Sequence, residues 1–428
     1  MQTRYASPLW SRCRQRAPGL RLVIRYSSTL QPRQLEFASF FFHNARWKSA
    51  VPIHSIKYPP PPPPLLRAAN STVVVESARP AEVASLGYRP SEVLTPRRLM
   101  KVYAQLSKSR LTTLVVLTAM GGVALSPLPT TIPVLLATAV GTALCSASAN
   151  TLNQLQEVPF DAQMARTRMR PLVRRAIRPV HAASFAIATG VSGPLLLWTI
   201  VNPTTACLGL LNIALYAGPY TWLKRRTIWN TWVGAVVGAI PPLMGWTACS
   251  GHLLPSISHT VAFFPPSFLA ASSVDPSLVD NPLAPLALCM VLFSWQFPHF
   301  NALSHIVRES YAQAGYQMLG VVSPLQNRLV ALRHALLFVP ICSILVPLSG
   351  LTTWAFALTS LVPNAIMVRA AWRFWKSGSG KHARTLFQHS LWFLPAILGL
   401  MMCHKQGMDW WSWIGGSAVD NDGEPDDT

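Results

Sequence analysis

The sequence predicts an all-α, polytopic integral membrane protein with nine transmembrane helices. Half of its 428 residues are hydrophobic and only 12% are charged, whereas soluble domains carry about 25% charged residues. Nine apolar runs follow one another, each close to the roughly 20 residues that a helix needs to cross a bilayer. They cover residues 109–126, 132–153, 179–200, 204–223, 230–249, 283–304, 329–348, 352–372 and 385–403.

The basic residues lie on one side of this predicted bundle. Every Lys and Arg from Lys101 to Arg384 falls before or at the start of the first apolar run, or in or beside the 2–3, 4–5, 6–7 and 8–9 connections. By the positive-inside rule, this basic side faces the inner compartment. Nine spans then place the C-terminus on the opposite side. The net charge of +21 does not indicate nucleic-acid binding, because the basic residues form no stripe with interleaved aromatic residues.

The N-terminal region predicts import into mitochondria. Residues 1–35 contain several arginines and serines and no acidic residue, which is typical of a mitochondrial transit peptide. Residues 36–98 include an unbroken proline run and are expected to be mostly disordered. A membrane domain at 99–405 and an acidic tail at 406–428 complete the predicted organisation. We therefore expect a multi-pass protein of the mitochondrial inner membrane, with its basic, catalytic side towards the matrix.

One stretch after the second apolar run concentrates acidic, amide and basic side chains. Asn153, Glu157 and Asp161 recur every four residues, so a helix places them on one face. Such oxygen donors suit Mg²⁺, which takes one or two carboxylates and completes its shell with water and substrate phosphates. Arg166 and Arg170 are again four residues apart and suit phosphate oxygens. The alternative is a solvated loop end between two helices, which does not explain why acid and base gather here.

Pro159 bears on the geometry of this stretch. A proline ends or kinks a helix, so Asp161 either continues the helix face or reaches a metal from a loop.

A second constellation lies in the 4–5 connection, on the same basic side. Lys224 and Arg225 are candidate phosphate ligands, with Tyr220 and Asn230 among their polar neighbours. The alternative is that the basic residues only anchor the helices at the membrane surface, and this interpretation is favoured for Arg226.

A third constellation begins inside the sixth apolar run, at Trp295–Phe300, and continues to Tyr311. A histidine inside a membrane span is costly and is therefore a functional candidate. His299 is suited to orienting a carboxylate, binding the edge of a porphyrin or ligating iron. The alternative is a packing histidine that is hydrogen-bonded to a backbone carbonyl.

Three segments of the chain resemble the UbiA-type intramembrane prenyltransferases, and within them the mitochondrial branch that farnesylates protohaem IX (haem b). They run from Asn153 to Leu172, from Tyr220 to Pro242 and from Trp295 to Leu303, and the similarity extends over roughly residues 99–402. The resemblance implies a nine-helix bundle with a central cavity and two acid-rich motifs that bind Mg²⁺-diphosphate. It also implies transfer of a farnesyl group to a haem vinyl group.

Two positions depart from the pattern of this family. Glu157 stands where the first motif usually has aspartate, and Ser310 stands where the second motif tends to have aspartate before a tyrosine, here Tyr311. Glu309, one place earlier, is the only acidic residue left on that connection. We therefore expect Glu309 to face Asp161 as a further metal ligand.

The predicted site combines these constellations. The catalytic residues are Asn153, Glu157, Asp161 and Lys224; the substrates are bound by Arg166, Arg170, Arg225, Tyr220, Asn230, His299, Glu309 and Tyr311; the metal is held by Asn153, Glu157, Asp161 and Glu309.

The predicted function is transfer of the farnesyl group of farnesyl diphosphate to haem b, giving haem O, with Mg²⁺ as cofactor. One alternative is a UbiA-type prenyltransferase that acts on a quinone precursor, against which Trp295–Phe300 argues. The other is a transporter or assembly protein without chemistry. A transporter would show internal repeats or intramembrane ion pairs, and the sequence has no charged pair at mid-span depth. The expected partners are the lipid bilayer and, in haem biosynthesis, a haem A synthase or a haem donor.

Overall fold

The structure is a computed structural model in which residues 95–269 and 275–408 are described. The predicted transit peptide, nearly all of the Pro-rich segment and most of the acidic tail lie outside the described residues. The first described helix begins at Pro96, close to the predicted start of the membrane domain.

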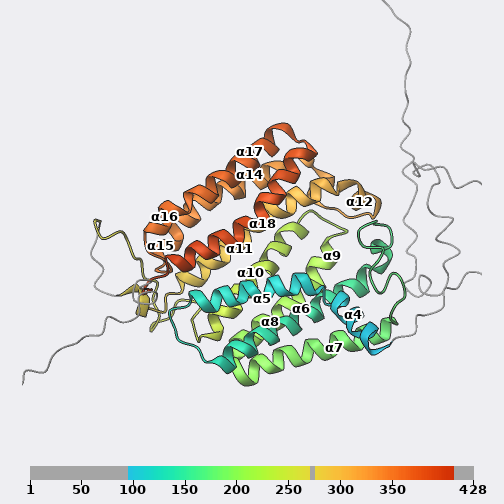
Figure 1. Cartoon of the computed structure of the whole chain (residues 1–428), viewed down its shortest axis with the longest axis horizontal. Coiled ribbons are helices and arrows are strands. Elements are labelled where there is room, and N and C mark those ends of the chain that lie inside the picture. Colours follow the sequence, from blue (N-terminus) through green and yellow to red (C-terminus); the bar gives the residue numbers. More distant parts are fainter. Residues whose placement is uncertain (1–94, 270–274, 409–428) are drawn as a thin grey trace, which may run out of the picture. The chain divides into compact units, whose positions relative to one another are not determined.

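Helices are the regular secondary structure of the described residues, which contain one isolated bridge between Thr352 and Lys405 and no strand; this confirms the all-α prediction (Figure 1). In chain order the helices are α4 (Pro96–Leu106), α5 (Ser109–Leu125), α6 (Ile132–Asp161), α7 (Pro179–Leu196), α8 (Pro203–Leu215), α9 (Thr221–Leu223), α10 (Asn230–Ala248), α11 (Leu283–Ile306), α12 (Arg308–Gln313), α13 (Leu319–Val322), α14 (Pro324–Pro340), α15 (Val346–Leu348), α16 (Ala355–Thr359), α17 (Leu361–Ser377) and α18 (Gly380–Cys403).

Single π-helical turns continue three of these helices. They follow α7, α8 and α14 at Leu197–Val201, Tyr216–Tyr220 and Ile341–Leu345.

Six helical runs among the described residues are long and apolar enough to cross a membrane. They are Ile132–Asp161, Pro179–Val201, Leu283–Ile306, Pro324–Leu348, Ala355–Ser377 and Gly380–Cys403. Helix α5 is apolar but shorter, with 17 residues. Helices α8 and α10 lie where the fourth and fifth spans are predicted, but neither belongs to the six. The multi-pass character is supported, and the number of nine spans stays a prediction.

The end of α6 resolves the two alternatives for Pro159. The proline lies inside the helix, and Asp161 is the last helical residue. A proline removes one backbone donor, and this loss falls in the final turn, where few further hydrogen bonds depend on it. Helix α6 therefore carries the whole predicted acidic face to its end.

Close packing between α5 and α10 depends on glycine. A Cβ added to Gly245 would lie 1.8 Å from the carbonyl oxygen of Ala119, and one added to Gly122 would lie 2.1 Å from that of Pro242. Both positions therefore need glycine for the two backbones to approach, as small residues allow in membrane helix pairs.

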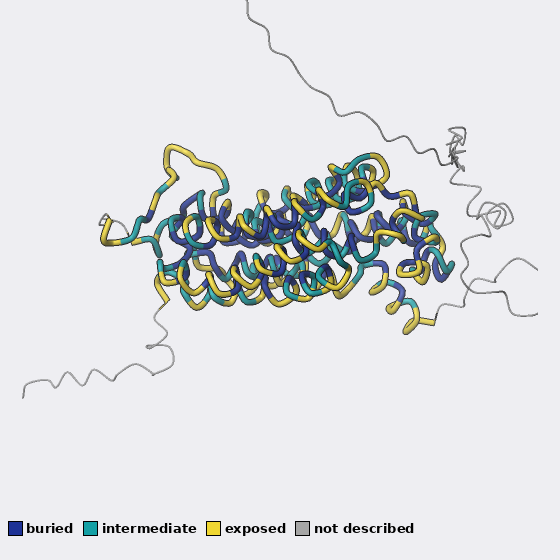
Figure 2. The backbone as a smooth tube through the Cα atoms, turned by 90° about the horizontal axis from the view of Figure 1, so that it is seen from above, coloured by how far each residue is buried: buried dark blue, intermediate teal, exposed yellow. Residues whose placement is uncertain are grey.

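Helices α11, α14, α17 and α18 form the other large packing unit. Its apolar core includes the fully buried rings of Phe338, Phe374 and Phe393. Exposed residues follow the outer surface of the helices (Figure 2). Many of these are large and apolar, such as Leu114, Ile187 and Val362, which suits a surface that faces hydrocarbon.

The two ends of the helix bundle differ. Helices α4, α9 and α12 lie at one end, and α15 and α16 lie at the other (Figure 1).

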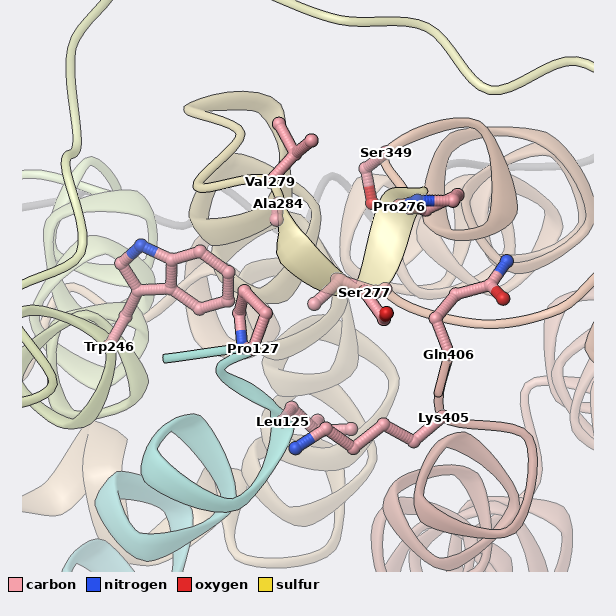
Figure 3. Close-up of a pocket in the computed structure, with 12 residues that line it drawn as sticks. Leu125, Pro127, Trp246, Pro276, Ser277, Val279, Ala284, Ser349, Lys405 and Gln406 are labelled. Carbon is pink, nitrogen blue, oxygen red and sulfur yellow. The ribbon is translucent and has the colours of Figure 1, made fainter. Parts of the chain in front are cut away.

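Near α15 and α16, a small pocket of about 10 Å³ lies beside Trp246 and Ser277 (Figure 3). Its lining includes Lys405, whose Nζ donates to the carbonyl oxygens of Ala124 and Ser126 at 2.8 Å each. Burial lowers the pKa of Lys405. This lysine thus satisfies free carbonyls at the end of α5.

Candidate active site

The last turns of α6 present three buried polar side chains. Asn153 and Asp161 are each 1% exposed and Glu157 is 4% exposed. Buried carboxylates are retained in proteins only when they are paired or hydrogen-bonded. Their partners therefore define the site.

Both carboxylates are paired with cations from outside α6. The Nζ atom of Lys224, just after α9, donates to Oε1 of Glu157 at 2.8 Å. An Nη1 of Arg170, in the connection after α6, forms a short ion pair with Oδ2 of Asp161 and lies 3.8 Å from Oε2 of Glu157. The connections after α6 and α9 thus meet at the acidic face, as the sequence predicted for one basic side.

Asn153 is held by two neighbours. Its amide Nδ2 donates to Oγ1 of Thr221 at 3.0 Å, and its Oδ1 accepts from Nζ of Lys108 at 3.1 Å. Lys108 also donates to the hydroxyl of Tyr216 at 3.3 Å. Its backbone φ of 49° places it in the left-handed region, at the break between α4 and α5.

Sequence reasoning missed Lys108 and Tyr216. A lysine directly before an apolar run is typical of an anchoring residue, and nothing in its spacing relates it to α6. Only the packing of α5 and the end of α8 against α6 brings these side chains together.

Lys108, Glu157, Asp161, Arg170 and Lys224 form a charged cluster, in which basic side chains outnumber acidic ones. Burial, followed by the nearby Arg170 and Lys224, lowers the pKa of Lys108 well below 10.5. Burial is the largest influence on Lys224 and would lower its pKa, but the adjacent Glu157 and the tyrosine hydroxyls around it together outweigh burial and raise that pKa well above 10.5. Three basic side chains and two carboxylates thus lie together, and an anionic ligand would favour the protonated form of Lys108.

Two predicted phosphate ligands lie around this cluster. Arg166 extends Nη2 to 3.5 Å from the hydroxyl of Tyr311, which is buried and comes from α12. Burial raises the pKa of Tyr311. The guanidinium of Arg225 lies 4.7 Å from the ring centre of Phe160 in a cation–π contact.

The polar neighbours predicted in the 4–5 connection have different roles. The ring of Tyr220 lies 4.5 Å from Nζ of Lys224. Asn230 is fully buried and donates to the carbonyls of Thr227 and Gln317, at 2.6 and 3.0 Å, which ties the start of α10 to the segment before α13. Tyr220 thus contacts the charged cluster directly, whereas the hydrogen bonds of Asn230 fix the backbone beside it.

Glu309 is not placed as the sequence led us to expect. It is exposed on the first turn of α12, and no hydrogen bond or ion pair joins its side chain to another residue that the structure describes. Asp161 is instead paired with Arg170. In this short helix, Tyr311 is the residue that packs inward.

A cavity of about 560 Å³ lies next to the cluster. Its walls come mainly from α5, α6, α10, α11 and α18 and are mostly apolar. A few polar residues interrupt them, including Asn150, Tyr216, Tyr220, Asn230, Gln296 and His299. Tyr216 belongs to both regions, because it lines the cavity and contacts Lys108.

His299 lines this cavity in a defined orientation. Its ring stacks on Trp295 with the centroids 4.6 Å apart, and its Nδ1 lies 2.8 Å from Oγ of Ser390. The Ser390 hydroxyl donates to the carbonyl of Phe387 at 2.6 Å, so its oxygen is the acceptor for Nδ1–H. This tautomer leaves the lone pair of Nε2 available on the other side of the ring.

Comparison with known sequences extends the resemblance seen in the motifs. Residues 114–394 match the profile of the UbiA prenyltransferase family. A mitochondrial protoheme IX farnesyltransferase of Yarrowia lipolytica is 43% identical over 361 residues, covering 81% of this chain and 70% of the relative. The protein of the same name from Homo sapiens is 46% identical over 305 residues, covering 71% of this chain and 62% of the relative.

Solved structures share the fold at low sequence identity. A digeranylgeranylglyceryl phosphate synthase superposes with a TM-score of 0.53 at 13% identity, covering 71% of this chain and 98% of that chain. A UbiA homologue from Aeropyrum pernix K1 gives a TM-score of 0.50 at 18% identity, covering 69% and 97%.

Proposed function

Because the chain belongs to the UbiA prenyltransferase family, we propose that it transfers the farnesyl group of farnesyl diphosphate to a vinyl group of protohaem IX, giving haem O. The relatives that share 43% and 46% of its residues are named for this activity. One structural observation carries the proposal: a buried cluster with excess positive charge lies beside an apolar cavity.

The diphosphate is assigned to the charged cluster. Lys108, Arg170 and Lys224 converge there, and Arg166 and Arg225 lie around them. Ammonium and guanidinium groups in a buried site bind phosphate oxygens more strongly than in water. The same cations stabilise the charge that develops on the leaving diphosphate.

The residues of α6 suit a Mg²⁺ ion. Each of the three predicted oxygen ligands already accepts from a cationic side chain: Asn153 from Lys108, Glu157 from Lys224 and Asp161 from Arg170.

The side-chain oxygens of Asn153, Glu157 and Asp161 thus already face positive charge. A hard divalent cation would take the place of the basic side chains that now contact these oxygens. When bound, Mg²⁺ supplies further neutralisation of the diphosphate. Glu309, which the sequence predicted as a fourth ligand, is exposed on α12 and is left out of the metal site proposed here.

The cavity is assigned to the farnesyl chain and the porphyrin. Its volume lies within the usual range for small-molecule sites, and its apolar walls exclude water from a reactive allylic cation. His299 is the strongest candidate to hold the haem. Its bond to Ser390 fixes the ring and leaves Nε2 as a lone-pair donor, which suits either the haem iron or a porphyrin carboxyl proton.

The reaction then follows from these positions. The bond between the allylic carbon and the diphosphate oxygen breaks, and the diphosphate departs into the cationic cluster. The terminal vinyl carbon of haem b forms a bond with the allylic carbon. The cation left beside the pyrrole ring takes the oxygen of one water, which releases a proton and gives the hydroxyalkyl group of haem O.

The cellular setting is proposed from charge and kinship together. The relatives are named mitochondrial, and the basic connections of this chain indicate that the cluster faces the matrix from the inner membrane. A haem A synthase or a haem donor remains the expected partner.

The test is a product assay on the purified protein in lipid nanodiscs with farnesyl diphosphate, haem b and Mg²⁺, read by mass. We expect haem O. A parallel reaction offers 4-hydroxybenzoate as the acceptor. A prenylated aromatic acid with no haem product would favour the quinone-precursor alternative, and no product with either acceptor would contradict prenyl transfer.

A further inference from the structure

The connection between α10 and α11 lies at the end of the bundle opposite the charged cluster. Residues 249–282 contain no Lys or Arg, but they carry two histidines and two aspartates. The proposed reaction uses none of these side chains. Three of them nevertheless meet, although they are separated by up to 28 positions in the sequence.

His252, His259 and Asp280 place ligand atoms within 4.8 Å of one another. Oδ2 of Asp280 accepts from the backbone N–H of His252 at 2.9 Å and lies 2.7 Å from its Nδ1. The rings of His252 and His259 stack with their centroids 3.7 Å apart and an angle of 20° between the planes. No other trio of His, Cys, Asp or Glu in the described ranges is grouped in this way.

A simple ion pair does not account for this arrangement. It would use one imidazole and one carboxylate, and it leaves the second imidazole unexplained. Two protonated imidazoles stacked at 3.7 Å would repel each other. The carboxylate of Asp280 is 8% exposed, and its Oδ1 is buried without a hydrogen-bond partner. A buried carboxylate oxygen without a partner is costly.

The surroundings of His259 resemble the outer shell of a metal ligand. Its Nδ1 lies 2.9 Å from Oγ of Ser258 and 3.4 Å from Oγ of Ser256. Metal-binding histidines commonly use one ring nitrogen in such a hydrogen bond, which fixes the ring and leaves the other nitrogen for the metal. Among the described residues, the hydrogen bonds of the His259 ring all involve Nδ1, which leaves Nε2 for this role.

We propose that His252, His259 and Asp280 form a binding site for a Zn²⁺-like divalent metal. Two imidazoles and one carboxylate match the donors that Zn²⁺ takes when a fourth position is left to water. The ligand set differs from the all-oxygen set on α6 that suits Mg²⁺. The metal would fasten the connection after α10 to the residues that lead into α11.

The proposal is tested by metal titration of the full-length protein in nanodiscs, purified with a tag that contains no histidine and freed of metal with a chelator. Co²⁺ is added first, because its visible absorption reports tetrahedral coordination, and Zn²⁺ is then used to displace it. We expect one equivalent to bind. His259→Ala and Asp280→Asn should each weaken binding about tenfold or more.

His382→Ala is the matched control. Its Nδ1 also contacts serine hydroxyls, at 2.7 Å from Ser377 and 2.8 Å from Ser379, but it has no carboxylate partner among the described residues. We expect this variant to bind Co²⁺ and Zn²⁺ as the unaltered protein does. Absence of binding by the unaltered protein, or equal binding by all variants, would overturn the proposal.

Hydrogen exchange provides a second readout that a failure to fold would not imitate. Zn²⁺ should slow amide exchange in residues 252–264 of the unaltered protein and leave exchange unchanged in Asp280→Asn. The melting temperature without metal identifies any variant that is simply unfolded. Exchange rates that are the same with and without Zn²⁺ in the unaltered protein would exclude a metal that fastens this connection.

Discussion

The end of α6 and the start of α12 both place carboxylates next to cations on the basic side of the protein, yet they are built differently. Glu157 and Asp161 on α6 are at most 4% exposed, and each is paired with a cation. Glu309 on α12 is exposed and unpaired among the described residues, although Arg308 precedes it. Burial, rather than the presence of acid beside base, therefore distinguishes the two regions.

The difference has a physical cause. Removing the partner of a buried ion pair is strongly destabilising, about 3–5 kcal/mol, so the acidic face of α6 requires Arg170 and Lys224. An exposed pair contributes at most about 1 kcal/mol, so Glu309 imposes no such requirement on its neighbours. The comparison predicts that the same chemical change has very different effects in the two helices.

The largest effect is expected for Glu157→Gln. The amide keeps the size of the side chain but removes the charge that faces Lys224 and the proposed Mg²⁺. Turnover should fall about 10²–10³-fold, as when one strong electrostatic contact to a transition state is lost. Steady-state haem O formation at saturating substrates measures it.

This variant also leaves Lys224 buried without a counter-charge, so a loss of folding has to be separated from a loss of chemistry. Glu157→Gln combined with Lys224→Met removes both charges. The double variant should recover the melting temperature of the unaltered protein and stay inactive. Recovery of turnover in the double variant would contradict a catalytic role for this pair.

A smaller loss of turnover, about 10²-fold or less, is expected for Lys108→Met, which removes a charge-assisted contact.

The environment of Lys108 also predicts that activity depends on pH. Because burial lowers the pKa of Lys108, the ammonium loses its proton at lower pH than an ordinary lysine does. Activity that needs this cation therefore declines as the pH rises through the lowered pKa.

Lys108→Arg is the control for this pH dependence. Arginine stays charged in proteins, so the alkaline limb should move to higher pH in this variant. An alkaline limb that is identical in Lys108→Arg and the unaltered protein would exclude Lys108 as its source.

His299→Ala tests the cavity rather than the cluster. Loss of one coordinating or hydrogen-bonding group should weaken haem binding about tenfold. Farnesyl diphosphate binding should change little, because His299 contacts Trp295 and Ser390 and none of the charged residues. Titrations with haem b and with farnesyl diphosphate separate the two affinities. Weakened diphosphate binding with normal haem binding would reverse the assignment.

The smallest effect is expected for Glu309→Gln. It makes the same chemical change as Glu157→Gln on the same side of the protein, but at an exposed and unpaired position. We expect turnover to stay within about threefold of the unaltered protein, in line with the low value of exposed charges. A loss as large as that of Glu157→Gln would show that α12 delivers a carboxylate to the metal, as the sequence predicted.

The sequence was sufficient where a regular pattern determines the structure. The four-residue spacing of Asn153, Glu157 and Asp161 predicted one helix face, and all three lie on α6 and are buried. The helical runs also lie where apolar length predicted them.

Such patterns do not predict contacts between segments that are far apart in the sequence. Lys108 meets Asn153 across 45 positions, and His252 meets Asp280 across 28. The orientation of Glu309 depends on the turn between α11 and α12, which spacing does not specify.

The most direct test of the central claim is the Mg²⁺ dependence of farnesyl diphosphate binding, measured on protein in nanodiscs with an unreactive thio-analogue. The unaltered protein should bind the analogue more tightly as Mg²⁺ rises. Glu157→Gln combined with Lys224→Met should lose most of that dependence, whereas Glu309→Gln should retain it. If the double variant kept the full Mg²⁺ dependence, the acidic face of α6 would not be the metal–diphosphate site.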